Sequence, residues 1–198
     1  MTKLIVNLYG GPGSGKSTMA AGLFSFAKNM GINAELVQEA AKDWAWERRP
    51  ITSTDQLCLL AEQCKRERRL VNDCDLIITD SPILLQQYYE EKYSDYKHLV
   101  APGIIQWHQQ IMKSFKPLHV FVNRVKPFNP EGRLHTEEQS TQIDEELLTF
   151  LLQHANRYPH FVTGDDAGLV LLSSKILKRF KYVAKDLAYW YIAGGEYV

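Results

Sequence analysis

A glycine-rich stretch near the N-terminus constrains the fold of this chain more than any other feature. The apolar run at residues 3–9 is typical of a buried strand, and it leads directly into GGPGSGKST at residues 10–18. The spacing G-x-x-x-x-G-K-S within that stretch is the pattern of a phosphate-binding loop. A glycine-rich turn that binds nothing is the alternative, but the strand, the loop and the following helical pattern stand in the order that the motif requires. The sequence therefore predicts an α/β sheet with an anion site at the end of its first strand.

The chemistry of the loop follows from its residue types. Glycines have no Cβ atom, so the backbone can curl and direct several N–H groups at one anion. The helix that starts near Lys16 adds the positive end of its dipole. Lys16 is placed to reach the β- and γ-phosphates, and the Ser17 hydroxyl is placed to hold Mg²⁺. We therefore expect ATP and Mg²⁺ as cofactors, bound by Gly10, Gly11, Pro12, Gly13, Ser14, Gly15, Lys16, Ser17 and Thr18.

The composition is that of a soluble globular domain. The chain has 198 residues, 45% of them apolar, with 23 basic and 23 acidic residues. A formal net charge of zero does not favour general binding to polyanions, although a local basic patch is compatible with it. No apolar run approaches the ~18 residues of a membrane span, and we interpret the first apolar run as a strand rather than a signal peptide. The three cysteines lack metal-site spacing, so we expect reduced thiols.

Strand and helix patterns alternate along the chain. The expected strands are residues 3–9, 32–37, 75–80, 118–123 and a short one that starts at about 161. A strand, a helix and a second strand at this spacing form a βαβ unit, which favours a parallel sheet with a right-handed crossover. We therefore predict a three-layer αβα P-loop NTPase fold with a five-stranded, mainly parallel sheet. Residues 1–165 form the predicted domain, and residues 166–198 form a C-terminal helical extension packed on it.

Two carboxylates, Glu39 and Asp80, follow the second and third predicted strands. Ligands of a parallel α/β sheet bind at the carboxyl ends of the strands, so we expect both residues at the same edge as the loop. Glu39 is placed to accept a proton from an attacking hydroxyl or to hold magnesium through water; an acidic residue that only opens a helix is the alternative. Asp80 ends an apolar run, which is the pattern of a residue that holds Mg²⁺ directly or through its water. Together with Lys16, these carboxylates are the predicted catalytic centre.

Aromatic and basic side chains near these carboxylates are candidates for substrate binding. Trp44 and Arg48 follow Glu39 and are suited to stack on a base or pair with phosphate, although tryptophans at this spacing are equally compatible with a core. Residues 83–116 are predicted to be helical and are rich in aromatic residues, of which Tyr88 is the candidate for an acceptor pocket. A packing layer of aromatic side chains is the alternative for that region.

A segment rich in proline, glycine and cations follows the fourth predicted strand. Residues 124–136 are expected to form a mobile flap over the phosphates, ahead of a polar helix at about 137–154. Closure of the flap would exclude water and bring Arg124 or Arg133 to the transferring group, where negative charge must be stabilised. A basic surface loop without a catalytic role is the alternative.

The last predicted helix spans residues 167 to about 192 and has one apolar and one basic face. The basic face is either solvated or in contact with nucleic acid. The aromatic run at residues 189–191 is expected to pack on the domain or on a second subunit, which makes a homodimer one expected arrangement.

Four segments together resemble a known family: GGPGSGKST at 10–18, VQEAAK at 37–42, TDSP at 79–82, and the segment from NRV at 123–125 to GR at 132–133. They resemble the small P-loop kinases of bacterial viruses, which are often described as AAA-type ATPases. They are also similar to the ribosylnicotinamide kinase domain of bifunctional NAD regulators and, more distantly, to deoxynucleoside kinases. The resemblance covers residues 1–165.

The resemblance implies an ATP-dependent kinase that transfers the γ-phosphoryl group to a hydroxyl of a nucleoside-like acceptor. Some viral members phosphorylate 5-hydroxymethyluracil in DNA, a step of thymine hypermodification, and this acceptor is favoured over a deoxynucleotide or nicotinamide riboside. In deoxynucleoside kinases a glutamate after the second strand is the general base, a role that the resemblance assigns to Glu39. Those kinases have Arg where this chain has Ser81, so their mode of substrate binding is not implied here. A cytoplasmic location is expected, in the host if the protein is viral.

Two other classes of function remain open from the sequence. An NTPase switch would hydrolyse ATP to change partners, and a nucleotide-binding module would carry out no chemistry. The combination of Glu39, Asp80 and Arg133 favours the kinase. We find no arginine finger or sensor motif, which argues against the mechanics of true AAA machines.

Overall fold

The fold is built on a five-stranded parallel sheet. The computed structural model describes residues 3–96, 99–129, 131, 135–155 and 157–180. The strands are β1 (Lys3–Tyr9), β2 (Ala34–Val37), β3 (Leu76–Thr79), β4 (Phe115–Asn123) and β5 (His160–Thr163), in the order β2-β3-β1-β4-β5. All four pairings are parallel, which confirms the predicted sheet. Because β1 is the central strand, its carboxyl end is flanked by the ends of β3 and β4.

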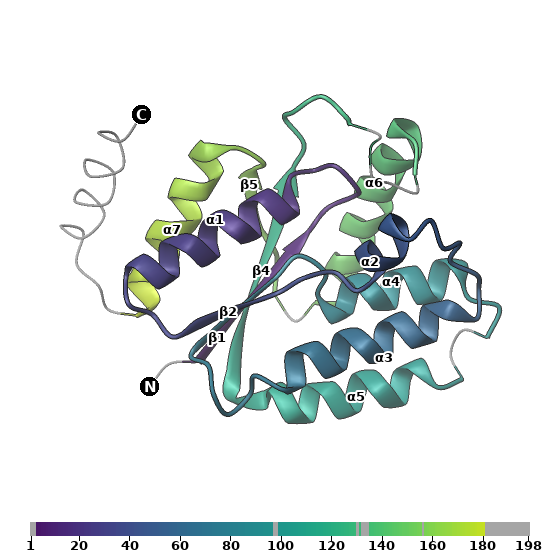
Figure 1. The fold of residues 1–198 in the computed structure, drawn as a ribbon, viewed down its shortest axis with the longest axis horizontal. Coiled ribbons are helices and arrows are strands. Elements are labelled where there is room, and N and C mark those ends of the chain that lie inside the picture. Colours follow the sequence, from purple (N-terminus) through teal and green to yellow (C-terminus); the bar gives the residue numbers. More distant parts are fainter. Residues whose placement is uncertain (1–2, 97–98, 130, 132–134, 156, 181–198) are drawn as a thin grey trace.

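Helices cover both faces of the sheet and complete three layers (Figure 1). They are α1 (Lys16–Asn29), α2 (Ala41–Trp46), α3 (Asp55–Arg68), α4 (Ile83–Tyr93), α5 (Ala101–Ile111), α6 (Glu137–His154) and α7 (Asp166–Arg179), with a 3₁₀ turn at Met112–Ser114. α1 and α7 pack on one face, whereas α3, α4, α5 and α6 lie on the other. The predicted αβα architecture is therefore confirmed.

The strands are apolar along most of their length because both faces of the sheet are covered. On β1, Leu4, Val6 and Leu8 pack against α1 and α7, whereas Ile5 and Tyr9 belong to clusters on the other face. This division follows from the alternation of side chains along a strand. Full burial of each large apolar side chain contributes about 1.5–3 kcal/mol, so β1 anchors the loop that follows it.

Two helical regions differ from the sequence prediction. The helical region 83–116 divides into α4 and α5, because the backbone becomes extended at Ser94 and a new helix starts with Pro102 in its first turn. The helix expected over 167–192 is observed as α7, and its remainder, including residues 189–191, lies outside the described residues.

α7 shares the hydrophobic core of the domain. Leu172, Ile176 and Leu177 are buried in the same cluster as the apolar residues of β1 and α1. At the crossing of the two helices, a Cβ added to Gly22 of α1 would lie 2.8 Å from the Leu169 side chain. A residue with a Cβ at position 22 would therefore displace the end of the Leu169 side chain.

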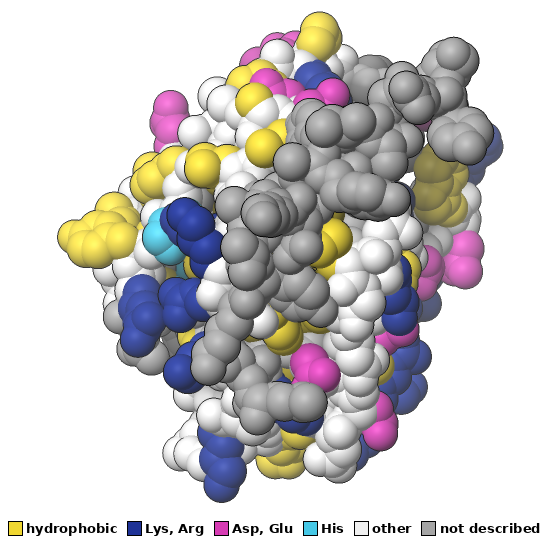
Figure 2. All heavy atoms as spheres, turned by 90° about the vertical axis from the view of Figure 1, so that its left-hand side faces the viewer, with side chains coloured by type: hydrophobic (Ala, Val, Ile, Leu, Met, Phe, Trp, Pro, Cys, Tyr) yellow, Lys and Arg dark blue, Asp and Glu magenta, His cyan; other side chains and the backbone are white. Residues whose placement is uncertain are grey.

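The side of the molecule at the left of Figure 1, which carries α1 and α7, faces the viewer in Figure 2. Lys and Arg side chains gather around a histidine at the left of this view, next to apolar side chains, and further basic, acidic and apolar side chains are scattered over the rest of it. Lys175 of α7 contacts His160 (Nζ to Nδ1, 3.0 Å), and burial, Lys175 and Arg179 together lower the pKa of His160. The surface is therefore mixed in charge, and nucleic-acid contact by this helix stays a prediction.

Two further predictions concern the state of the cysteines and the presence of membrane-spanning helices. All three cysteines are free; Cys58 is exposed, and Cys64 and Cys74 are buried. Burial raises the pKa of the Cys64 thiol to about 12, which leaves it inert at neutral pH. Among the helices that the structure describes, none combines the length and the apolar character needed to cross a bilayer.

Candidate active site

The phosphate loop connects β1 to α1 and takes its shape from glycines in the left-handed region. Gly10, Gly13 and Gly15 have φ angles of 138°, 83° and 102°, which residues with a Cβ rarely adopt. Gly15 is also limited by space, because a Cβ there would lie 3.0 Å from the carbonyl oxygen of Gly164. The loop therefore has the curled backbone that the motif predicts.

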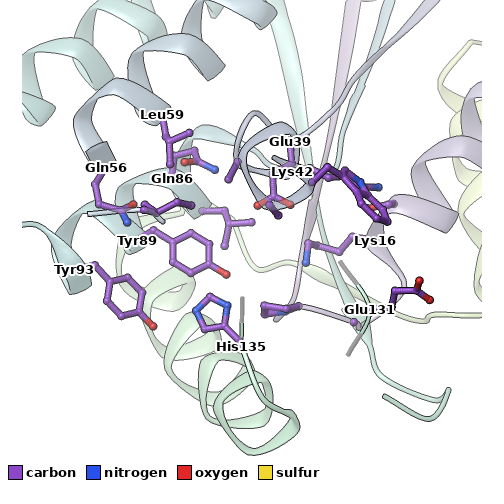
Figure 3. A pocket seen from close by; sticks show the side chains of 18 of the residues that line it. Lys16, Glu39, Lys42, Gln56, Leu59, Gln86, Tyr89, Tyr93, Glu131 and His135 are labelled. Atoms are coloured by element: carbon purple, nitrogen blue, oxygen red, sulfur yellow. The ribbon is translucent and has the colours of Figure 1, made fainter. Parts of the chain in front are cut away.

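Lys16 lies across the mouth of the loop. Its side chain is buried, and Nζ donates hydrogen bonds to the carbonyl oxygens of Gly10 (2.6 Å) and Gly11 (3.0 Å). The ammonium group is thereby held at the edge of a cavity, toward which it points in Figure 3. A cation fixed at this point can meet the terminal phosphates of a nucleotide bound to the loop.

Two carboxylates reach the same edge of the sheet as the loop, because β2 and β3 lie beside β1. Asp80 is buried directly after β3, and its Oδ1 accepts a hydrogen bond from the N–H of Glu39 (2.9 Å). The next N–H, that of Ala40, donates to Gln63 Oε1 (3.2 Å). These contacts fix the backbone after β2, so that the Glu39 side chain lines the cavity and points into it (Figure 3). The buried Asp80 therefore orients the segment that presents Glu39.

Ser17 and Asp80 are the residues predicted to hold magnesium, and both offer the oxygen ligands that Mg²⁺ prefers. Ser17 lies in the first turn of α1 and lines the cavity. In the part of the chain that the structure describes, no group of three or more His, Cys, Asp or Glu residues is arranged to hold a metal ion. Asp80 is buried and is not among the described residues that line the cavity, so its role in holding magnesium stays a prediction.

One continuous cavity of about 700 Å³ extends from the phosphate loop, past Glu39, to the side chains of α4. Lys16 and Ser17 line it at the loop end, and residues of α2, α3, α4 and the predicted flap line the rest. Figure 3 shows Lys16, Glu39 and Tyr89 directed toward the same space. Its volume is in the range of small-molecule sites, which often measure about 300–1,000 Å³. The arrangement offers room for a second molecule beside a nucleotide.

Three rings and two carboxamides form the end of the cavity that is remote from the loop. Tyr89 and Tyr93 of α4 stack with ring centroids 6.0 Å apart, and His135 lies 6.3 Å from each of them. Gln56 of α3 and Gln86 of α4 are buried and also line this end. We call Gln56, Gln86, Tyr89, Tyr93 and His135 the aromatic wall.

Tyr89 and His135 of the aromatic wall are uncharged at neutral pH. Burial raises the pKa of Tyr89 well above its usual value, and the nearby charge of Glu39 raises it further. The pKa of His135 is lowered by burial and then by the positive charges of Lys92 and Lys16, so its imidazole is neutral at pH 7. Ser81 also supports the wall, because its Oγ accepts a hydrogen bond from Gln86 Nε2 (2.5 Å).

The sequence analysis selected Tyr88 of α4 as the candidate for an acceptor pocket, whereas the structure places its neighbour Tyr89 in the lining of the cavity. Tyr88 is buried, its hydroxyl donates to Glu146 (2.6 Å), and its ring packs against Phe150; it is not among the described residues that line the cavity. Adjacent helical residues point about 100° apart, so Tyr89 faces the cavity instead. The helical spacing of Leu85, Gln86, Tyr89 and Tyr93, which share one face, was the available signal for this site.

Trp44 and Arg48 also lie outside the described lining of the cavity. The guanidinium of Arg49 stacks 3.5 Å from the Trp44 ring centroid, and Arg48 is exposed with a φ angle of 55°. From α2 it is Ala41, Lys42, Ala45 and Trp46 that line the cavity. α2 therefore presents Trp46 to the cavity, because Trp44 is turned toward Arg49.

The flap residues divide into two groups. Arg124 does not line the cavity in the described structure; its Nη1 donates to the carbonyl oxygen of Pro12 (2.9 Å) and its Nη2 to Asp144 Oδ2 (2.9 Å). Glu131 and His135 do line the cavity, and the sequence reasoning missed both. Arg133 lies outside the described residues, so its predicted role stays a prediction.

Comparisons with known proteins agree with this geometry. A model of the AAA domain family matches residues 5–165. The structure of NadR protein in complex with NR is similar to this chain with a TM-score of 0.64 at 16% identity. NadR protein in complex with NAD and AMP-PNP is similar with a TM-score of 0.62 at 15% identity. Both comparisons cover 89% of this chain but only 51% and 49% of the NadR chains, so this chain spans about half their length. No curated protein matches the sequence significantly.

At these identities the structural likeness shows the fold, which is that of a P-loop NTPase with a five-stranded parallel sheet. The family match includes the phosphate loop, both carboxylates, the flap and the helices that build the cavity. The chain therefore belongs to the AAA domain family and has its nucleotide-binding P-loop fold.

Proposed function

We propose that this protein is an ATP-dependent kinase that transfers the γ-phosphoryl group to a hydroxyl of a nucleoside-like acceptor. One observation carries the proposal: the cavity that starts at the phosphate loop continues past Glu39 to the aromatic wall. A hydrolytic switch needs only a water molecule beside the γ-phosphate, whereas this cavity has space and side chains for a second organic substrate. The likeness to NadR protein, solved with NR and with AMP-PNP, supports the same class of function.

Each group at the site has a role in the proposed reaction. The loop N–H groups and Lys16 bind the phosphates and stabilise the charge on the transferring group. The acceptor oxygen forms a bond to the γ-phosphorus while Glu39 takes its proton; the bond to the β,γ-bridging oxygen breaks and ADP leaves. Ser17 and Asp80 would hold Mg²⁺, which neutralises phosphate charge when bound. Asp80 also keeps Glu39 in place through the Glu39 N–H.

The aromatic wall supports an acceptor with a flat, uncharged ring. Tyr89 and Tyr93 offer ring surfaces for stacking. Gln56 and Gln86 each combine hydrogen-bond donors with an acceptor, which suits the amide edge of a nucleobase. Among the described lining residues the cations are Lys16 and Lys42, neither of which belongs to the wall.

We favour 5-hydroxymethyluracil in DNA as the acceptor. Its ring is uncharged and has an amide edge, and its hydroxymethyl group supplies the hydroxyl that attacks. Lys42 and the exposed Trp46 line the cavity from α2, where they are suited to contact neighbouring nucleotides of a strand. The resemblance of the four sequence segments to kinases of bacterial viruses supports the same acceptor.

Ribosylnicotinamide is the second candidate, supported by the likeness to NadR protein in complex with NR. Lys92 lies beside the wall, with its Nζ 5.5 Å from the centroid of the Tyr93 ring, but its charge is paired with Glu146 (Nζ to Oε2, 2.5 Å). The wall therefore accommodates either flat ring, and the test includes both acceptors.

The test measures where the phosphate goes. Purified protein is incubated with γ-labelled ATP, Mg²⁺ and one of three acceptors: an oligonucleotide containing 5-hydroxymethyluracil, a deoxynucleoside monophosphate or nicotinamide riboside. We expect label in the oligonucleotide in equal amount to the ADP formed, and none in a matched oligonucleotide containing thymine. Release of free phosphate without label in any acceptor would show a switch and overturn the kinase.

A further inference from the structure

We propose that Asp144 is a positioning residue of the phosphate loop, and that Arg124 cancels its charge so that the loop can accept a triphosphate. This inference rests on the proposed function in taking ATP as the ligand of the loop. Asp144 lies in the second turn of α6, 133 residues beyond the loop residue that it contacts.

The contacts form a closed ring of four groups. Asp144 Oδ1 accepts a hydrogen bond from the N–H of Gly11, and Oδ2 accepts from Arg124 Nη2 (2.9 Å). Arg124 Nη1 then donates to the carbonyl oxygen of Pro12 (2.9 Å), the residue after Gly11. Neither Asp144 nor Arg124 is among the described residues that line the cavity. The ring therefore supports the loop from outside the space that a substrate would fill.

The backbone of the loop needs this support. Gly11 is buried, and a buried N–H without a partner would cost about 1–3 kcal/mol. α6 also approaches Gly11 so closely that a Cβ there would collide with the carbonyl oxygen of Ser140 and lie 3.0 Å from Asp144 Oδ1. The loop and the second turn of α6 are therefore held together by both packing and hydrogen bonding.

The charges give this support a consequence for nucleotide binding. A carboxylate beside an anion-binding loop opposes the phosphates unless its charge is cancelled. The side chains of Arg124 and Asp144 are only 15% and 20% exposed, so solvent screens them weakly. Removal of the arginine alone leaves a negative charge beside the triphosphate, whereas removal of both charges does not. If the contact only supported the fold, removing both side chains would weaken ATP binding at least as much as removing Arg124 alone.

The ring also joins the two ends of the flap to the loop. Arg124 is the first residue after β4, and α6 begins directly after the flap with a capping box formed by Thr136 and Gln139. Arg124 at the start of the flap therefore hydrogen-bonds to Pro12, and Asp144 of the helix that follows the flap hydrogen-bonds to Gly11. In this arrangement Arg124 favours nucleotide binding indirectly, by neutralising the negative charge of Asp144.

The experiment measures binding of ATP and Mg²⁺ to the full chain by calorimetry, without any acceptor. The variants are Asp144→Asn, Arg124→Ala, the double variant, and Glu145→Gln as a control at the next, exposed position of α6. Arg124→Lys tests rescue by a conservative cation, and thermal unfolding of each variant reports the fold. Asn keeps an oxygen for the Gly11 N–H while removing the charge.

We expect Arg124→Ala to weaken ATP binding about tenfold or more, as loss of a charge partner does. The double variant should bind ATP several-fold more tightly than Arg124→Ala, Arg124→Lys should recover part of the loss, and Glu145→Gln should match the wild type. A double variant as weak as Arg124→Ala, or weaker, would overturn the inference. Failure of the wild-type protein to bind ATP would instead contradict the proposed function. Failure of the inference and failure of the proposed function are therefore distinguishable.

Discussion

The two ends of the cavity are built in different ways. The loop end consists of consecutive residues whose backbone groups and glycine conformations make the site. The aromatic wall consists of side chains from α3, α4 and the end of the flap, which are far apart in the sequence. The first construction tolerates almost no change and serves every nucleotide-binding protein of this kind, whereas the second can be altered one side chain at a time. Under the proposed function, chemistry is therefore fixed at the loop, and the choice of acceptor is made at the wall.

The largest expected effect falls on the loop end. Lys16→Ala should abolish phosphoryl transfer to every acceptor, because it removes a buried cation that stabilises charge in the transition state, a contribution of about 3–4 kcal/mol in comparable sites. Lys28→Ala, which removes an exposed cation from the other end of the same helix and outside the cavity lining, is the matched control and should keep most activity. Initial rates with labelled ATP measure both variants. Near-normal turnover by Lys16→Ala would mean that the loop is not the catalytic site.

The next largest effect is expected at Glu39, which lies between the loop end and the aromatic wall, and it should change phosphoryl transfer without changing ATP binding. Glu39→Gln should keep ATP affinity but lower transfer about 10²–10⁴-fold, because the acceptor hydroxyl loses its proton acceptor. The defect should shrink at high pH, where hydroxide replaces the base. ATP titration and acceptor phosphorylation across pH check this, with Glu47→Gln, an exposed position after α2, as the control. Transfer within a few-fold of the wild type would leave Asp80 as the next candidate for the base.

A smaller and more selective effect is expected at the aromatic wall. Tyr89→Ala should raise the KM for the acceptor about tenfold and leave the KM for ATP unchanged, since loss of one stacking partner costs about 1–3 kcal/mol. Tyr88→Phe is the control on the same helix, because its hydroxyl contacts Glu146 rather than the cavity. Separate KM values for ATP and acceptor give the answer. An equal change in both constants would contradict the assignment of the wall to the acceptor.

The smallest effect is expected outside both ends, at His119 of β4. Its ring nitrogen bonds the hydroxyl of Tyr9 (2.8 Å), and burial, followed by the charge of Arg157, lowers its pKa from 6.5 to about 4. Because the folded pKa is below the unfolded one, protons favour the unfolded state, and stability falls as pH drops from 6.5 toward 4. Between pH 7.5 and 5.5 this residue should cost about 1 kcal/mol.

Urea unfolding of the wild type and of His119→Gln at the two pH values measures that contribution. The variant should lose part of the pH dependence of stability, while both KM values at pH 7.5 stay unchanged. An identical pH dependence in the two proteins would show that His119 is not the group responsible.

The sequence predicted the fold and the loop end well, and the physical reason lies in their construction. The motif at residues 10–18 carries its own conformation in its glycines, and the positions of Glu39 and Asp80 follow from where parallel strands end. The wall could not be predicted in the same way, because its composition depends on the rotation of α4, which brings Tyr89 rather than Tyr88 to the cavity. Which tryptophan of α2 faces inward depends on packing that no local pattern records.

The distance along the chain between the loop and its supports has a consequence for folding during synthesis. The loop is among the first segments to be made, but its hydrogen-bond partners are made much later. Arg124, the partner of Pro12, lies 112 residues further along the chain, and Asp144, the partner of Gly11, lies 133 residues further. β1 likewise pairs with β4, whose residues come more than 100 positions later. A nascent chain that has emerged only as far as β3 contains the whole nucleotide motif without the groups that hold it in shape. Nucleotide should therefore stabilise only late folding intermediates, and early ones must reach the parallel sheet through slow, non-local pairing without help from the ligand.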